Sequence, residues 1–375
     1  MNIFYDENMP FAAEFFADLG KLKPFSGREL AAADIRDADV LLVRSITKVN
    51  EDLLQNNRQL SFVGTATIGV DHIDQNYLAS RQVSFHSAPG CNAVSVAEYV
   101  LSAMVVLAER YLLSLPELTV GIVGAGNTGT RLSEKLRALN INHVLCDPYL
   151  AKDAADKRDF VDLEQALSCD VVSLHVPLTT TGEHPTFHLL NAPRLAQFND
   201  QQILINACRG EVIDNTALLT MKQAGHPLKL VLDVWENEPN ILFDLIAHCE
   251  IATAHIAGYS LEGKARGTET LYRALCQQLG VVATKQLSDF LPTPAISNLE
   301  IKQAFDDILL NQLVKMVYDV RRDDAIFRQQ ITLQGFDRIR KTYPTRREFS
   351  SITVSLDHTL STDVPHQLGF NKNTG

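Results

Sequence analysis

Three polar residues that each follow an apolar run have the types needed for acid–base chemistry beside an anion. They are Arg209 after ILINAC, Glu238 after LVLDVWEN and His255 after IATA. An arginine just past a buried strand needs a counter-charge, either a carboxylate of the protein or an anionic ligand. A histidine exchanges protons near neutral pH, and a glutamate on its second ring nitrogen orients the ring and stabilises its charged form. If the three loops meet, which spacing alone does not fix, Arg209 binds a carboxylate while His255 takes a hydroxyl proton.

A glycine-rich turn between a strand and a helix predicts a dinucleotide site. The run LTVGIVGAGNTG, residues 118–129, has the form of a strand that enters a G-x-G-x-x-G turn, and residues 128–139 have helical character. Such glycines let the backbone approach a pyrophosphate, which faces the helix N-terminus. The cofactor-binding residues predicted in this turn are Gly124, Gly126, Asn127, Thr128 and Gly129.

An acid at the end of the next strand favours NAD over NADP. Residues 142–147, NHVLCD, form a predicted strand that ends in Asp147, and no arginine adjoins it in the sequence. A carboxylate there accepts hydrogen bonds from the adenosine ribose and would repel a 2′-phosphate. Asp233 lies at a later strand end, where it either holds the nicotinamide carboxamide or caps its own turn.

Alternating strands and helices must position these residues. Candidate strands in the N-terminal part are residues 2–5, 40–44, 61–65 and 83–86, with helical segments at 10–19 and 50–56. This alternation predicts an α/β fold with parallel sheets, in which ligands bind beyond the carboxyl ends of the strands. Polar residues at those ends, which could equally cap loops, are Asp6, Arg44, Ser45 and Thr67. A capping box from Ser95 to Glu98 predicts the start of a long helix over 96–113.

The C-terminal residues predict a small α+β module. Apolar residues recur at helical spacing from 298 to 321, which predicts one long helix with an apolar face, and SSITVSL at 350–356 alternates as a strand does. The apolar helix face must be buried, either by a second subunit or by the module's own strands.

Composition excludes several classes of protein. The 375 residues predict two or three domains, and 46% hydrophobic with 21% charged residues is typical of a globular chain. The net charge of −11 argues against nucleic-acid binding. The first residues do not have the pattern of a signal peptide, so none is expected, and the most apolar helix-like run, residues 100–108, is too short for a membrane span. Six scattered cysteines favour reduced thiols in the cytoplasm. His184 and His188 are separated by Pro185, so no helical metal site, and no metal, is expected.

Seven motifs in order along about residues 1–285 resemble those of the D-isomer-specific 2-hydroxyacid dehydrogenases. They are GVDHID, NAVSVAEYVL, GIVGAGNTG, HVPLTTTG, INACRGEVID, LDVWENEP and TAHIAGYS. The resemblance implies that Arg209 anchors the substrate carboxylate, that His255 is the acid–base and that Glu238 is its partner. It implies further cofactor contacts at His175, Ala207, Cys208, Arg209, Asp233 and Gly258, and further substrate contacts at Ser45, Thr67 and Tyr259.

The same resemblance implies a domain arrangement. A flavodoxin-like substrate-binding domain is expected to be split between 1–95 and 256–285, with a Rossmann-type NAD domain inserted at 96–255 and a C-terminal domain at 286–375. The chain looks most like a subgroup in which that last domain forms a homodimer and the substrate is a small phosphorylated hydroxy acid. The phosphate needs a second cationic site, for which Arg44 or the pair Arg346 and Arg347 are candidates.

Two other functions compete with this expectation. One is a dehydrogenase of the same family acting on glycerate or phosphoglycerate. The other is an NADH-sensing regulator on the same scaffold, which need not retain an acid–base residue. The complete set of Arg209, Glu238 and His255 favours an enzyme.

Overall fold

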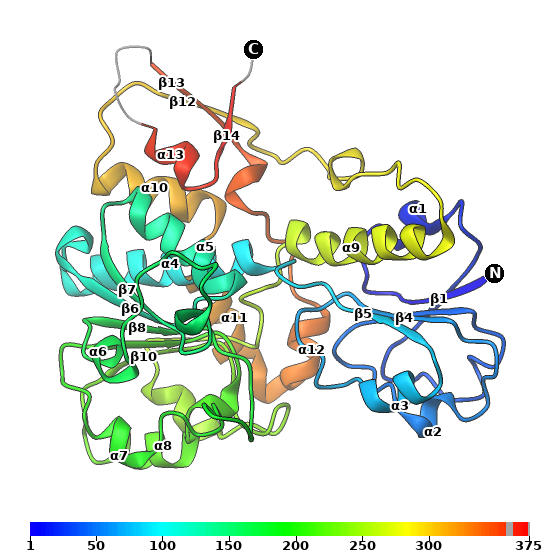
Figure 1. Ribbon diagram of the computed structural model, residues 1–375. Coiled ribbons are helices and arrows are strands. Elements are labelled where there is room, and N and C mark those ends of the chain that lie inside the picture. The colour runs from blue at the N-terminus through cyan, green and yellow to red at the C-terminus, as the bar shows by residue number, and fades with distance from the viewer. Residues whose placement is uncertain (358–362, 374–375) are drawn as a thin grey trace. The chain divides into compact units, whose positions relative to one another are not determined.

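The computed structural model describes residues 1–357 and 363–373 (Figure 1). The chain divides into two compact units, each made of two segments. The first unit contains Met1–Asn92 and Tyr259–Thr293, and the second contains Ala93–Gly258 and Pro294–Gly375. The C-terminal residues thus group with the middle of the chain, and the three-domain boundaries expected from the sequence stay a prediction.

The first unit is built on a five-stranded, wholly parallel sheet, as the sequence predicts. Its order is β2-β1-β3-β4-β5, the flavodoxin-like arrangement. The strands are β1 (Asn2–Asp6), β2 (Lys21–Phe25), β3 (Val40–Val43), β4 (Phe62–Thr65) and β5 (Ser84–His86). The sequence prediction missed β2. That strand lies at the edge of the sheet, so it is largely exposed and tolerates Pro24.

Helices cover both faces of this sheet, and each face has its own apolar core. Figure 1 shows α9 (Leu261–Leu279) on one side and α2 (Glu51–Leu54) and α3 (Gln75–Ser80) on the other. The α9 side, which includes α1 (Ala12–Phe16), buries phenylalanines of α1 against Leu271, Tyr272 and Leu275 of α9. The opposite side buries leucines of α2 and α3 against the strands.

The second unit is built on a six-stranded parallel sheet of order β11-β10-β9-β8-β6-β7. The strands are β6 (Thr119–Val123), β7 (Asn142–Cys146), β8 (Val171–Leu174), β9 (Ile203–Asn206), β10 (Lys229–Leu232) and β11 (Ile251–Ala252). An isolated parallel bridge joins Leu145 to Phe160 beside β7. With that bridge counted as a strand, the order is that of a Rossmann fold, and the glycine-rich turn after β6 lies at the point where strand order reverses.

The helices of this part of the second unit are α4 (Ala93–Tyr111), α5 (Asn127–Ala138), α6 (Leu163–Leu167), α7 (Ala192–Leu195) and α8 (Asn215–Gln223). The long helix predicted over 96–113 is confirmed as α4, but the capping box is wrong. Ser95 and Glu98 lie inside α4 and are buried. The Ser95 hydroxyl donates to Glu348 and its carbonyl oxygen accepts from Arg346, while Glu98 accepts from the Phe349 N–H. A pattern that resembles a helix start is here a polar patch on a buried helix.

The C-terminal segment contains a small parallel sheet, β12-β13-β14, and several helices. Its elements are β12 (Asn298–Ile301), α10 (Asp307–Val317), α11 (Val320–Gln334), α12 (Phe336–Lys341), β13 (Thr353–Leu356), α13 (Val364–Gln367) and β14 (Asn371–Lys372). The single helix predicted over 298–321 is therefore wrong. Asp306 and Asp319 each cap a new helix with the side chain, which divides the apolar pattern into a strand and two helices.

The apolar face of α10 is only partly buried within its own unit. Leu309, Leu310, Leu313 and Val314 are buried, whereas Ile308 and Met316 remain 66% and 39% exposed. The following helix, α11, packs against the edge strand β11, and Asp324 of α11 accepts a hydrogen bond from the backbone of Ala252.

Within the described residues, no helix combines the length and apolarity that a bilayer crossing needs.

Candidate active site

The glycine-rich turn between β6 and α5 leaves room beside its backbone. Gly124 has a φ of +94°, and a Cβ on Gly129 would lie 2.1 Å from the Gly124 carbonyl oxygen. The fold itself therefore requires glycine at both positions. A Cβ on Gly126 would instead meet nothing within 4 Å. Open space at that position fits a group from outside the chain, such as the pyrophosphate of a dinucleotide.

The N-terminus of α5 points to the same group. Asn127 and Thr128 open this helix of 12 residues, and the N-cap residue Gly126 provides no side-chain hydrogen bond. The first backbone N–H groups of a helix have no partner within the helix and carry its positive dipole end. A bound anion satisfies both.

Asp147 ends β7 beside this turn. One of its carboxylate oxygens accepts a hydrogen bond from the Ala125 N–H at 3.1 Å, and the other accepts from the N–H groups of Tyr149 and Leu150. Arg158, which was not predicted from the sequence, donates to the Ala125 carbonyl oxygen at 3.0 Å. Its charge is matched by Asp156, to which it is bound through two nitrogens. The cation next to the turn is therefore already neutralised by the protein.

His175 follows β8 and has one ring nitrogen without a partner. Nε2 lies 2.8 Å from the Ser173 hydroxyl, while Nδ1 is buried and has no hydrogen-bond partner among the described residues. Burial lowers the pKa of His175 to about 4, so the imidazole is neutral at physiological pH. Its backbone packs behind the glycine turn, where a Cβ on Gly124 would lie 2.6 Å from it. An orphaned buried nitrogen at this position fits a ligand with a polar group.

The turn that carries Arg209 is braced by a buried asparagine. The side chain of Asn206, the last residue of β9, accepts from the Cys208 N–H at 3.1 Å and donates to the Arg209 carbonyl oxygen at 2.9 Å. Ala207 and Cys208 form the short link between them. Burial raises the pKa of the Cys208 thiol to about 11, which keeps it protonated and unreactive at neutral pH.

This turn packs directly against the loop that carries Glu238. A Cβ on Gly210 would lie 1.9 Å from the backbone of Trp235, so only glycine permits the contact. A glycine after the arginine predicts a turn at Gly210, but Asn206 was not predicted as a positioning residue. Its signal was present, since an asparagine at a strand end is typical of a tight, braced turn. The guanidinium of Arg209 donates one hydrogen bond to the Cys208 carbonyl oxygen at 2.8 Å.

Glu238 and His255 form the hydrogen bond that the sequence analysis expects. Nδ1 of His255 lies 2.7 Å from Oε2 of Glu238, and the other carboxylate oxygen accepts from the Trp235 N–H at 3.0 Å. Burial by itself would raise the pKa of Glu238, but His255 and Arg340 outweigh it, and the pKa lies below its ordinary value. The carboxylate is thus ionised and fixed, while Nε2 of His255 has no partner among the described residues.

Asp233 holds the turn on which His255 lies. Its buried carboxylate accepts hydrogen bonds from the Thr253 hydroxyl at 2.6 Å and from the backbone of Ile256 and Ala257 at 2.8 and 2.9 Å. Its own carbonyl oxygen accepts from the His255 N–H at 2.7 Å. His255 has a φ of +56°, a backbone conformation that residues other than glycine rarely adopt. The hydrogen bonds to Asp233 hold the backbone in this conformation. Gly258 follows directly and is half-buried.

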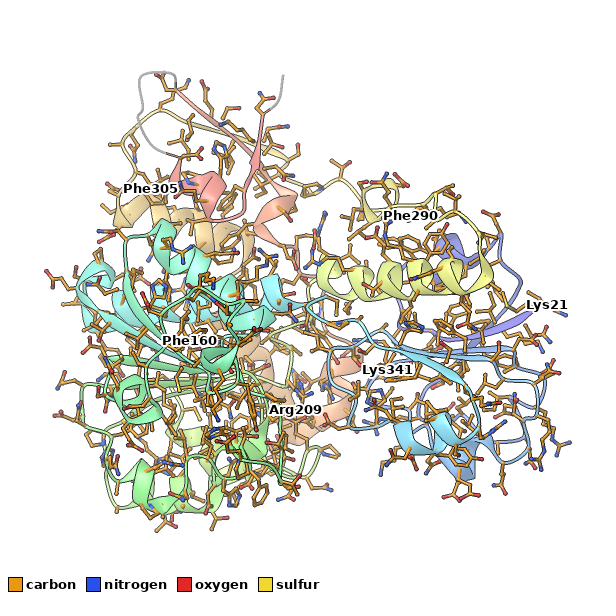
Figure 2. The ribbon with its side chains drawn as sticks, viewed as in Figure 1. Lys21, Phe160, Arg209, Phe290, Phe305 and Lys341 are labelled. Atoms are coloured by element: carbon orange, nitrogen blue, oxygen red, sulfur yellow. The ribbon has the colours of Figure 1, made fainter. Side chains whose placement is uncertain are left out.

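The sheet brings the three loops to one edge. β9, β10 and β11 are adjacent parallel strands, and Arg209, Glu238 and His255 each follow the carboxyl end of one of them (Arg209 is labelled in Figure 2). The carboxyl ends of parallel strands are where α/β proteins bind ligands. The arrangement can hold an anion, exchange a proton and orient the group that exchanges it.

The substrate residues expected from the sequence lie in the first unit. Ser45 follows β3 and is exposed, and Thr67 follows β4, where its hydroxyl bonds to the Thr65 hydroxyl at 2.7 Å and to the Gly69 carbonyl oxygen at 3.0 Å. Tyr259 precedes α9, and the guanidinium of Arg44 lies 5.4 Å from the centre of its ring.

The proposal that Arg346 binds a substrate phosphate is wrong. Arg346 is only 2% exposed, donates to the Ser95 carbonyl oxygen and lies 3.8 Å over the ring of Tyr318. Its charge is offset by Glu98 in the interior of the second unit. The arginine is an internal ion of the fold, because the segment that looks like an exposed basic loop is folded against α4. Arg347 is half-buried, and its role stays a prediction.

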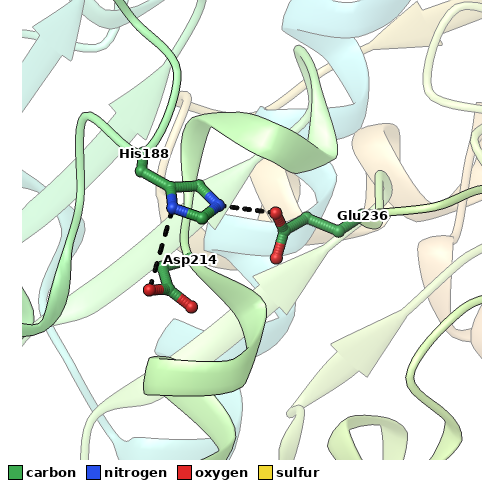
Figure 3. A group of neighbouring side chains, drawn as sticks. All are labelled: His188, Asp214 and Glu236. Carbon is green, nitrogen blue, oxygen red and sulfur yellow. Dashed lines mark hydrogen bonds and ion pairs between the residues drawn. The ribbon is translucent and has the colours of Figure 1, made fainter.

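A further cluster joins three loops of the second unit. Nε2 of His188 lies 2.6 Å from Glu236, and Nδ1 lies 3.8 Å from Asp214 (Figure 3). Figure 3 shows the two carboxylates on opposite sides of the imidazole ring. One ligand atom of each residue lies within 4.8 Å of the others, a spacing that a metal ion could use. In this structure each ring nitrogen faces one of the two carboxylates, and the cluster links the loops after β8, β9 and β10.

The comparisons with known proteins agree with this geometry. Residues 101–257 match the family model of the D-isomer specific 2-hydroxyacid dehydrogenase NAD binding domain, and residues 290–369 match a domain of unknown function. The chain belongs to the D-isomer-specific 2-hydroxyacid dehydrogenase family. It is 64% identical to the erythronate-4-phosphate dehydrogenase of Colwellia psychrerythraea over all of both chains. It is 53% identical to the enzyme of that name from Tolumonas auensis over 99% of each.

Solved structures show the same fold over about three quarters of the chain. The D-lactate dehydrogenase of Aquifex aeolicus, complexed with NAD and lactic acid, matches with a TM-score of 0.62 and 25% identity, covering 74% of this chain and 96% of that one. The NAD-bound 3-phosphoglycerate dehydrogenase of Entamoeba histolytica matches with a TM-score of 0.64 and 21% identity, covering 78% and 99%. The expected α/β fold and NAD as cofactor are confirmed.

Proposed function

We propose that the protein oxidises 4-phospho-D-erythronate to (R)-3-hydroxy-2-oxo-4-phosphooxybutanoate with NAD, a step of pyridoxal 5′-phosphate biosynthesis. Full-length identity of 64% to an erythronate-4-phosphate dehydrogenase supports the choice of substrate. The observation that carries the chemistry is the 2.7 Å contact between Glu238 and Nδ1 of His255 at the ends of neighbouring strands. A histidine held in this way is ready to act as a base without rearrangement.

In the proposed reaction, Arg209 binds the substrate carboxylate through its planar guanidinium. Nε2 of His255 then takes the proton of the C2 hydroxyl, while ionised Glu238 stabilises the imidazolium that forms. Bound NAD supplies the acceptor of the hydride that leaves C2. In the reverse direction, protonated His255 returns the proton to the ketone oxygen. Hydrogen bonds to the backbone hold both loops in place: Asp233 holds the turn of His255, and Asn206 holds the turn of Arg209.

The proposed cofactor site uses the residues around the glycine turn. Gly124, Gly126 and Gly129, with the N–H groups of Asn127 and Thr128, would hold the pyrophosphate, and Asp147 would bind the adenosine ribose. The remaining contacts would come from a group of residues at the strand ends: His175, Ala207, Cys208, Arg209, Asp233 and Gly258. The open space at Gly126 and the orphaned nitrogen of His175 support this assignment.

The test is turnover by the purified protein with a panel of hydroxy acids, followed at the absorbance band of reduced nicotinamide. We expect 4-phosphoerythronate to have the highest kcat/KM, ahead of 3-phosphoglycerate, glycerate and unphosphorylated erythronate. Preference for 3-phosphoglycerate or glycerate would reassign the substrate within the family. Binding of NADH without turnover of any acid in the panel would favour the NADH-sensing regulator.

The exposed surface of the second unit supports a homodimer as part of the proposal. A groove of about 500 Å³ lies between the end of α4 and α10, where Leu112 is 92% exposed and Ile308 66% exposed. Adjacent exposed side chains of this size are typical of an interface, and a second copy would cover them. We expect light scattering to show a dimer for the native protein and a monomer for Leu112→Asp/Ile308→Asp. Leu333→Asp on α11, where the leucine is 77% exposed away from the groove, is the control.

A cytoplasmic location completes the proposal. All six cysteines have free thiols, which suits a reducing compartment.

A further inference from the structure

Two cations of the first unit share one aromatic ring. Arg44 directly follows β3, and Lys264 lies in the first turn and a half of α9. The guanidinium of Arg44 lies 5.4 Å from the ring centre of Tyr259, and the ammonium of Lys264 lies 5.5 Å from the same centre. The two segments are far apart in the sequence, so the fold brings the positive charges together.

Neither charge has a carboxylate partner in the part of the chain that the structure describes. Arg44 donates to the Asn8 carbonyl oxygen at 3.2 Å, and among residues 1–357 and 363–373 no ion pair within 4.0 Å involves Arg44 or Lys264. Other cations of α9 and its neighbourhood are paired, as Arg273 is with Glu269 at 2.6 Å and Lys285 is with Asp18 at 2.7 Å. The nearest acid along the adjoining strand, Asp6, instead accepts hydrogen bonds from Asn8.

Keeping two like charges together costs free energy, and this cost is seen in the lowered pKa of Lys264. Burial, followed by the charge of Arg44, lowers the pKa of Lys264 to about 8. The face of the Tyr259 ring attracts both cations, but a cation–π contact contributes only about 0.5–2 kcal/mol. An anion between or beside the cations would remove the repulsion.

The end of α9 adds to the positive potential at this place. The Ser260 hydroxyl caps the helix by accepting from the Gly263 N–H at 2.8 Å, and the helix is 19 residues long. Its dipole directs partial positive charge toward the N-terminal turn. The cluster of Arg44, Lys264 and the start of α9, which we call the cationic pair site, therefore combines the three features that bind a phosphomonoester.

We propose that the cationic pair site binds the phosphate of the substrate, with Arg44 and Lys264 each donating to phosphate oxygens. This assignment rests on the proposed function, because it takes the ligand from the proposed substrate. It adds Lys264, which no sequence motif singled out. The site also lies next in sequence to the residues of the reaction, since Tyr259 follows His255 by four positions and Arg44 precedes Ser45.

The first experiment compares two substrates in Lys264→Gln and Arg44→Gln. For 4-phosphoerythronate we expect KM to rise ~10- to 100-fold in each variant, because each loses a charge-assisted hydrogen bond to the phosphate. The kcat/KM for erythronate, which has no phosphate, should fall far less. Lys48→Gln removes an exposed lysine from the same loop as Arg44 and serves as the control, with an unchanged KM.

Thermal unfolding separates this assignment from a structural role. Because the cations repel each other and have no carboxylate partner among the described residues, Lys264→Gln should leave Tm unchanged or raise it. A lowered Tm together with an equal loss of kcat/KM on both substrates would assign Lys264 to the fold and overturn the proposal.

A second experiment does not depend on the enzyme's activity. Binding of inorganic phosphate, measured by calorimetry, should be detectable in the native protein and lost in the Arg44→Gln/Lys264→Gln double variant. Native turnover of 4-phosphoerythronate with an unchanged KM in Lys264→Gln would overturn the phosphate site and leave the proposed function intact. The native protein could instead bind phosphate, lose that binding in the double variant, and fail to oxidise 4-phosphoerythronate. That result would keep the phosphate site and overturn the proposed function.

Discussion

The second unit contains two networks of polar and charged side chains that differ in exposure. One surrounds His255, with Glu238 bound to the ring and Asp233 holding the turn beneath it. The other surrounds Arg346, with Glu98 and Tyr318 as neighbours. His255 keeps 32% of its side-chain surface, whereas Arg346 is 2% exposed.

Under the proposed function, this difference separates a network that serves the reaction from a network that serves the fold. In the His255 network the partners occupy one nitrogen and the backbone, so that the second nitrogen stays accessible and oriented. In the Arg346 network the cation is enclosed, and a buried charge of this kind needs all its partners to remain folded. Changes at the two centres should therefore affect different observables.

The largest effect is expected at the centre of the exposed network. His255→Asn should lower kcat ~10²- to 10⁴-fold, because the general base is lost while a hydrogen-bonding side chain of similar size remains. NAD binding, measured by fluorescence titration, should change little, and so should Tm. His248→Asn changes a histidine that precedes β11 in the same segment and is the matched control. Retained turnover in His255→Asn would remove His255 from the reaction.

The enclosed network should respond in the opposite sense. Arg346→Met should lower the free energy of unfolding by about 3–5 kcal/mol, since it removes one of the two cations that offset the buried carboxylate of Glu98 and leaves only Lys135, at 3.5 Å. The kcat of the fraction that stays folded should be close to native. Urea unfolding measures the change, and Arg338→Met, at an exposed position of α12, should cost less than about 0.5 kcal/mol. A loss of kcat with native stability would show that the two networks are not separate.

Sequence patterns predicted the exposed network better than the enclosed one. Arg209, Glu238 and His255 were found because each follows an apolar strand, and parallel strands bring their carboxyl ends to one edge. Local patterns place each residue at a strand end, although spacing alone does not fix that the three loops meet. The contacts of Glu98 with residues 346–349 join positions about 250 apart in the chain, and no local period records them. Ser95 and Glu98 were therefore misread as a capping box.

The edge strand β2 and the division of the helix predicted at 298–321 were missed for related reasons. The exposed edge strand β2 lacks the apolar run by which the inner strands were found. The division of the predicted helix at 298–321 depends on Asp306 and Asp319, whose capping hydrogen bonds interrupt an apolar spacing that continues through them. Lys264 was missed because its nearness to Arg44 is a product of tertiary structure alone.

The smallest expected effect is a dependence of stability on pH, which tests whether the enclosed network contains a carboxyl that is destabilised when it ionises. Burial raises the pKa of Glu98 to about 7, with Lys135 opposing the shift and Glu348 adding to it. A carboxyl whose pKa is higher in the folded state contributes stability that is complete below its unfolded value of 4.5 and is lost as pH rises through about 7. The native protein should therefore lose stability across this window, at no more than about 1.4 kcal/mol per pH unit.

Glu98→Gln should flatten that dependence, because the amide does not titrate but can still accept the hydrogen bond from the Phe349 N–H. Urea midpoints at intervals between pH 5 and 7.5 measure the slope, and Glu134→Gln, at an exposed position of α5, should keep the native slope. If Glu98→Gln left the slope unchanged while lowering stability at every pH, the carboxyl would be ionised throughout, and Arg346 with Lys135 would fully compensate its burial. Such a network would then be as well satisfied as the one around His255, and exposure alone would distinguish the two.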